Sequence, residues 1–163
     1  MKTIFRHMRI LILLILSITL IACNKQKSNI EEFIQENQLE SIVSKSISDF
    51  ASSNRNNKAV FESHKIVGKE LKRDILSVYV IGYVIGVYDN NQGFGGEFPA
   101  HIKIQKTEDN YKVVSYKDAL ASADVYDIMP KKYAKDIFNY DTSSLSQVVK
   151  EQMEDWEKNN KSN

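Results

Sequence analysis

The residues of this chain with the clearest potential for chemistry are Glu62 and His64 on one segment and Tyr79 and Tyr83 on the next. Glu62 and His64 are two positions apart, so in a strand their side chains share one face. A carboxylate beside an imidazole can do acid–base work, although such a pair is more often a surface contact or a hydrogen-bonded core histidine. Tyr79 and Tyr83, with Tyr88 and Phe94 near the following turn, could line a concave face for a peptide, a glycan or a small ligand, or they could be core residues beneath helices. We therefore take His64, Tyr79 and Tyr83 as candidate ligand contacts and predict no catalytic residue.

The sequence gives little support for a metal or a cofactor. Segment 89–97 is rich in Asp, Asn and Gly, but Gly93 stands at the fifth position, where an EF-hand loop supplies an oxygen ligand. Phe94 stands at the sixth, which that loop reserves for glycine. Three histidines and a single cysteine make no zinc cluster, and His101 falls on the polar side of its segment, where we expect it to be solvated. We predict a turn at 89–96, with neither metal nor cofactor.

The N-terminus has the layout of a secretory signal. Residues 1–9 carry Lys2, Arg6 and Arg9 and no acidic residue, and residues 10–21 carry no charge. A positive segment followed by a short apolar one is typical of exported proteins. A twelve-residue helix would span about 18 Å, well short of the roughly 30 Å hydrocarbon core of a bilayer. This length argues against a permanent transmembrane helix.

The apolar segment ends in Leu20-Ile21-Ala22-Cys23, which resembles the lipobox of bacterial lipoproteins. The resemblance implies that a diacylglycerol is attached to the sulfur of Cys23 and that the chain is cut between Ala22 and Cys23. The protein would then be anchored by lipid on the outer face of the plasma membrane. The alternatives are an ordinary signal peptide with an accidental cysteine, or an uncleaved anchor.

The charge balance limits the kinds of partner that the chain could bind, and the cysteine content limits how an exported domain could be stabilised. Removing residues 1–22 takes away three basic residues and no acidic one, which leaves 19 of the 22 Lys and Arg against 21 Asp and Glu. Such a balance gives no polybasic footprint for nucleic acid. The single cysteine cannot form a disulfide within the chain, so an exported domain would depend on its hydrophobic core. Heavy use of Ile, Lys and Asn suits a low-GC Gram-positive source.

Hydrophobic periodicity predicts one α+β domain over residues 30–158, between a tether at 23–29 and a polar tail at 159–163. Ser28 has the spacing of a capping box at the start of a helix. Apolar residues then recur at helical intervals up to Ala51, which predicts one helix over this segment. An antiparallel meander of about four strands then follows, over residues 60–71, 75–88, 97–106 and 111–116. The remainder reads as helices, with Pro130 in a first turn and a last helix starting near Ser144. By analogy, a curved sheet around one helix occurs in cystatin-like and NTF2-like domains.

Several segments also carry a family resemblance. Residues 61–70, 78–79, 111–117 and 128–132, together with the glycines before Pro99, resemble uncharacterised lipoproteins and extracytoplasmic domains of Firmicutes. Some of those domains are outer portions of membrane proteins of the BlaR sensor type. The resemblance covers roughly residues 59–137, and it implies a sensor-like role without any catalytic residue.

Together these patterns predict a lipid-anchored extracytoplasmic domain that binds or senses an envelope protein, a peptide or a glycan, and that is not an enzyme. One alternative is a small enzyme with an NTF2-like pocket, which would need His64 or a buried carboxylate in a deep cavity. Another is an inhibitor or immunity lipoprotein that occludes a toxin or a hydrolase.

Overall fold

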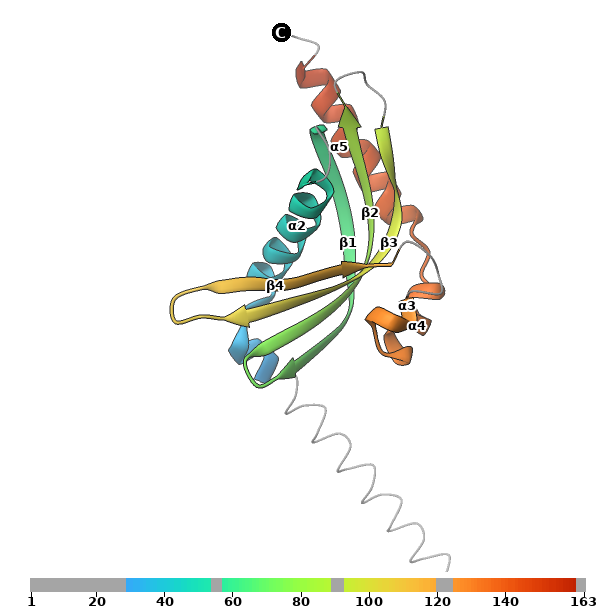
Figure 1. The fold of residues 1–163 in the computed structure, drawn as a ribbon. Coiled ribbons are helices and arrows are strands. Elements are labelled where there is room, and N and C mark those ends of the chain that lie inside the picture. The colour runs from blue at the N-terminus through green and yellow to red at the C-terminus, as the bar shows by residue number, and fades with distance from the viewer. Residues whose placement is uncertain (1–28, 54–56, 89–92, 120–124, 161–163) are drawn as a thin grey trace, which may run out of the picture.

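The computed structural model describes residues 29–53, 57–88, 93–119 and 125–160. It confirms the α+β prediction: an N-terminal helix is followed by a four-stranded antiparallel meander and then by helices packed on the sheet (Figure 1). The elements are α2 (Glu36–Ser53), β1 (Asn57–Lys72), β2 (Ile75–Tyr88), β3 (Gly93–Lys106), β4 (Tyr111–Asp118), α3 (Val125–Ile128), α4 (Lys131–Phe138) and α5 (Ser143–Asn160). The predicted cleavage and lipidation residues, Ala22 and Cys23, and the predicted cap Ser28 lie outside the described residues.

The sheet has the strand order β1-β2-β3-β4, so each strand pairs with its neighbour in sequence. β2 is central and has apolar side chains on both faces, because helices cover it on both sides. One face packs against α2, and the other packs against α3, α4 and α5 (Figure 1). The sheet is strongly curved, with α2 lying along its inner side.

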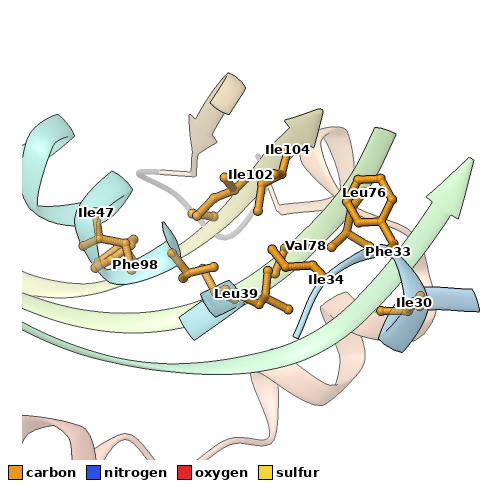
Figure 2. Packing of buried hydrophobic residues seen from close by; sticks show 13 residues of the cluster. Ile30, Phe33, Ile34, Leu39, Ile47, Leu76, Val78, Phe98, Ile102 and Ile104 are labelled. Atoms are coloured by element: carbon orange, nitrogen blue, oxygen red, sulfur yellow. The ribbon is translucent and has the colours of Figure 1, made fainter. Parts of the chain in front are cut away.

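The largest core cluster lies between α2 and the sheet (Figure 2). Leu39, Val43 and Ile47, at helical intervals of four, are the buried residues of α2. They pack onto alternate residues of the central strands, among them Val78 and Ile102, which are fully buried. An apolar stripe on one helix face and a period of two on the strands therefore build this core, as expected from the sequence.

The predicted continuous helix up to Ala51 is wrong at one point, because residues 29–33 are helical and the chain leaves the helix at Ile34 and Gln35. Ile34 and Leu39 are both buried in the same cluster. Five residues of continuous α-helix would turn these two side chains roughly 140° apart. The break lets both segments direct their apolar sides at the sheet.

The opposite face of the sheet carries two smaller clusters. Tyr79 and Ile81 pack beneath α3 and α4, where Met129, Ala134 and Ile137 are buried. Phe61 and Val87 pack beneath α5 around Val149. α5 begins at Ser143, whose N–H donates to the Asp141 carboxylate at 2.9 Å, so the predicted start at Ser144 is one residue late. The helix extends to Asn160, two residues into the predicted polar tail.

The glycine-rich run was predicted as a turn, but Gly93, Phe94, Gly95 and Gly96 are the first residues of β3. Residues 89–92 lie outside the described residues. Phe94 pairs with Gly86, and Phe98 pairs with Gly82. A Cβ at Gly82 would lie 2.5 Å from Cζ of Phe98, and a Cβ at Gly86 would lie 2.2 Å from Cε1 of Phe94. Each ring thus fills the space over a glycine of β2, and this packing of Phe94 and Phe98 helps to hold the first part of β3 in the sheet.

Candidate functional site

A cavity of about 480 Å³ opens on the α2 side of the sheet, between the end of α2, the start of β3 and the end of β4. Its floor is apolar, formed by Ile47 from α2, Val84 from β2 and Phe98 from β3. Ile47 and Phe98 are buried core residues. The volume falls within the range of small-molecule sites, about 300–1,000 Å³.

The walls of the cavity are aromatic. Phe50 on α2 stacks on Tyr116 of β4, with ring centroids 4.3 Å apart and planes at 24°. Phe50 follows Ile47 by three residues, so both lie on the helix face directed at the sheet. Gly95 and Gly96 also border the cavity; neither has a side chain to occupy it.

One carboxylate belongs to this site. Asp118 ends β4 and pairs with Ala100, a core residue on the α2 face of the sheet. Burial raises the pKa of the Asp118 carboxyl above its usual value, partly offset by a hydrogen bond to its own backbone. Burial, with the charges of Asp118 and Glu62, also raises the pKa of the Tyr116 hydroxyl, so Tyr116 stays neutral at physiological pH. Glu97 also borders the cavity, but it pairs with Tyr83, a position on the other face of the sheet.

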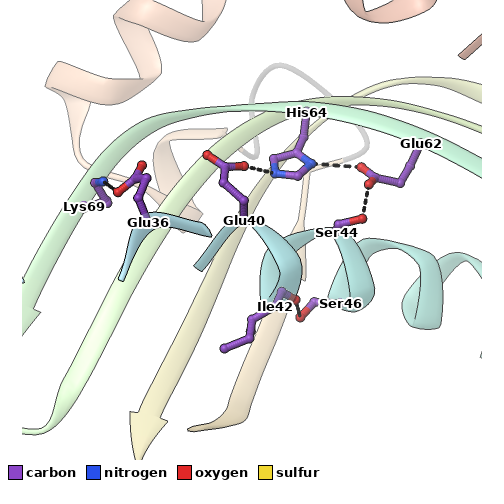
Figure 3. Close-up of polar contacts among 8 residues, drawn as sticks. All are labelled: Glu36, Glu40, Ile42, Ser44, Ser46, Glu62, His64 and Lys69. Atoms are coloured by element: carbon purple, nitrogen blue, oxygen red, sulfur yellow. Dashed lines mark hydrogen bonds and ion pairs between the residues drawn. The ribbon is translucent and has the colours of Figure 1, made fainter. Parts of the chain in front are cut away.

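Three contacts between side chains join α2 to β1 along the length of the helix (Figure 3). Glu36 accepts a hydrogen bond from Lys69 at 2.6 Å, Glu40 contacts His64 at 2.9 Å, and Ser44 donates to Glu62. The residues on α2 are spaced by four, which puts them on one side of the helix. These contacts fix how α2 lies along β1 and thereby position the Phe50 end of the helix.

His64 lies between two carboxylates. Its Nδ1 is 3.0 Å from Glu62 and its Nε2 is 2.9 Å from Glu40. The side chains of His64 and Glu62 are only 8% and 10% exposed. Burial disfavours the charged imidazolium, but the hydrogen bonds and charges of Glu62 and Glu40 outweigh it, so the pKa of His64 is raised. Glu62 and His64 are in contact on β1, as their shared face predicts. Each of them also contacts α2, His64 through Glu40 and Glu62 through Ser44, and these contacts join helix and strand.

This contact predicts a pH-dependent stability. The raised pKa of His64 means that its contribution is complete below about pH 6.5 and is lost as pH rises through the folded-state value. We expect His64→Gln to lower the free energy of unfolding by about 1.5–3 kcal/mol at pH 6, typical of hydrogen bonds to charged groups, and by less at pH 9. Urea denaturation at both pH values measures the difference.

His101 provides the control for this prediction. Burial, with the charges of Lys103 and Lys117, lowers the pKa of His101, so its contribution is present at high pH and is lost as pH falls. The cost of His101→Gln should therefore grow between pH 5 and pH 8. A cost of His64→Gln that also grew with pH would contradict a raised pKa of His64.

The two tyrosines proposed as ligand contacts lie on the face of the sheet opposite the cavity. Tyr79 is only 4% exposed, and its ring stacks on His101 at 4.6 Å and on Tyr133 at 4.8 Å. Tyr83 is half-buried in the cluster beneath α5. His101, expected to be solvated, is half-buried against Tyr79, because α3 and α4 cover this part of the sheet. None of His64, Tyr79 and Tyr83 borders the cavity.

Phe94, one of the aromatic residues singled out from the sequence, borders the cavity, but the sequence did not point to Phe50, Tyr116 or Asp118. Their patterns predict only that Phe50 lies on the apolar side of a helix and that Tyr116 ends a strand. The sequence indicates only that each of these residues lies near the end of a helix or strand and on the side that packs against the α2 core. The stacking of Phe50 on Tyr116 depends on the curvature of the sheet, which no local pattern specifies.

The structure is an α+β domain with helices on both faces of its sheet. On the α2 side it has a cavity that is lined in part by aromatic rings. Within the part of the chain that the structure describes, no group of three or more His, Cys, Asp or Glu residues could hold a metal ion. None of the helices described has both the length and the apolar character needed to cross a bilayer. We found no match to a protein-family model, to a curated protein or to a solved structure.

Proposed function

We propose that this protein is a lipid-anchored extracytoplasmic binding module whose cavity takes a small ligand at the membrane surface. The observation that carries the proposal is the cavity of about 480 Å³, with its apolar floor and stacked aromatic wall. Ligand sites are concave and mostly apolar, with few polar groups that fix orientation. Asp118 supplies such a polar group here.

The anchor supports the same function. With lipid on Cys23, residues 23–29 would tether the domain, and seven flexible residues reach roughly 15 Å. The cavity would then stay near the outer membrane surface. The resemblance to extracytoplasmic domains of sensor proteins fits this placement and remains a prediction from the sequence.

Binding is favoured over catalysis by the surroundings of the candidate groups. The enzyme alternative needed His64 or a buried carboxylate in a cavity, and His64 lies in the contact between α2 and β1 instead. Asp118 does border the cavity, but its surroundings there are aromatic rings and an apolar floor. Such a site can hold a ligand by contact area and charge without any bond being made or broken.

A neutral probe tests the binding function. The full chain, placed in phosphatidylcholine nanodiscs with labelled Ile and Val methyl groups, is titrated with 4-phenylbutanol. We expect saturable shifts of the Ile47 and Val84 methyl signals, while Val149 beneath α5 stays unchanged. Linear shifts without saturation, or equal shifts at Val149, would show that the cavity does not bind.

A pair of tryptophan variants locates the binding. Ala51 borders the cavity, so Ala51→Trp should fill it and abolish the shift of Val84. Ser52 is the next residue of α2, is exposed and does not border the cavity, so Ser52→Trp should leave binding within about twofold, as expected for a surface substitution. Equal loss in both variants would contradict binding in this cavity.

A further inference from the structure

The cavity combines an apolar floor with the carboxylate of Asp118, and Glu97 is a second acidic residue on its border. Asp118 forms no ion pair within the described part of the chain. Among the described residues that border the cavity there is no Lys, Arg or His. Asp118 is half-buried and thus partly removed from water, and none of these bordering residues supplies a compensating positive charge.

The aromatic wall favours the same sign of charge. The faces of aromatic rings carry negative electrostatic potential and attract cations within about 6 Å of the ring centroid. Phe50 and Tyr116 form one wall of the cavity and Phe94 contributes another ring. Glu62, held on the same side of the sheet, also acts electrostatically on Tyr116. The site therefore combines a carboxylate with several aromatic rings, and both favour a positively charged ligand.

We propose that the ligand is a small organic cation with an apolar body, bound with its ammonium group at Asp118 and its apolar part on Ile47, Val84 and Phe98. This inference rests on the proposed function, since it names the ligand class of the same cavity. The aromatic rings that line the cavity favour a cation, and the apolar floor complements the hydrocarbon. An anionic ligand would meet Asp118 as a like charge.

A charge series of probes with one shared body tests the proposal. The full chain in phosphatidylcholine nanodiscs is titrated calorimetrically with 4-phenylbutylammonium, 4-phenylbutanol and 5-phenylpentanoate, with empty nanodiscs as the blank. We expect the ammonium to bind about tenfold more tightly than the alcohol, in line with one ion pair and a ring contact. We expect the carboxylate to bind more weakly than the alcohol.

Variants assign the preference to Asp118. Asp118→Asn should weaken ammonium binding about tenfold, to the level of the alcohol, and leave alcohol binding unchanged. Asp109→Asn removes the same charge from an exposed turn between β3 and β4 and should change neither affinity. Because the alcohol serves as an internal reference, a variant that merely misfolded would lose binding of both probes.

The outcomes separate the two proposals. Equal affinities for all three probes, or tighter binding of 5-phenylpentanoate, would overturn the cation proposal and leave the cavity as a binding site. An ammonium preference that survives Asp118→Asn would overturn the role of this carboxylate. If none of the probes binds, the cation proposal and the proposed function both fail.

Discussion

Replacing Phe98 with Ala should lower the free energy of unfolding by about 3–5 kcal/mol, the usual cost of removing a buried aromatic ring. Phe98 is only 7% exposed and belongs to the core beneath α2. Its ring covers Gly82, to which it is paired across β2 and β3. Urea denaturation followed by circular dichroism measures the loss. A cost below about 1 kcal/mol would mean that the ring is not part of the core.

A double-mutant cycle tests the close fit of ring and glycine. Gly82→Ala alone should cost about 1–3 kcal/mol, because its Cβ would overlap the Phe98 ring. In the Phe98→Ala background the same Cβ has room, so the double variant should be about 1–2 kcal/mol more stable than additivity predicts. Gly86 lies under Phe94 instead, so Gly86→Ala combined with Phe98→Ala should be additive.

Replacing Cys23 with Ser should abolish membrane anchoring altogether. Without a thiol no diacylglycerol can be attached, and stable anchoring requires two acyl chains or an equivalent second signal. In a Gram-positive host, the unchanged protein should enter the detergent phase with a diacylglyceryl mass on a chain that begins at Cys23. The variant should do neither, as intact mass and detergent partition will show.

Ser28→Ala supplies the matched control for the anchor, since Ser28 follows Cys23 in the predicted tether. It should leave lipidation and partition unchanged. An unchanged protein that keeps residues 1–22, or that is released free into the medium, would show that the lipobox prediction is wrong. The domain would then have to be treated as secreted or as anchored by its signal segment.

Much of the fold was predictable because strong patterns act locally. β2 was predicted as Ile75–Tyr88 and has these bounds in the structure, since an uninterrupted apolar run allows few other conformations. The helix break at Ile34 was missed because each half of the segment has a good helical period by itself. The phase difference between the two halves matters only once both must face the same sheet.

The cavity was not predictable for a related reason. The sequence directed attention to His64, Tyr79 and Tyr83, which carry recognisable chemistry but lie in contacts between helices and sheet. Asp118 and Phe50 are ordinary residues at the ends of elements far apart in the chain. They become neighbours of one hollow only through the curvature of the sheet and the path of α2. Gly95 and Gly96 were predicted to form a turn, but they belong to β3 and border the cavity.

Because side chains alternate along β2, only the backbone of this strand separates the floor of the cavity from the core on the other face of the sheet. Val84 faces the cavity, while its neighbours Tyr83 and Ile85 pack beneath α5 against Val149. Packed interiors contain few voids, so the residues packed beneath α5 hold β2 in place when a molecule enters the cavity. The outer surface of α5 therefore stays the same whether or not the cavity is occupied, and any partner that responds to occupancy would have to contact the α2 side of the sheet.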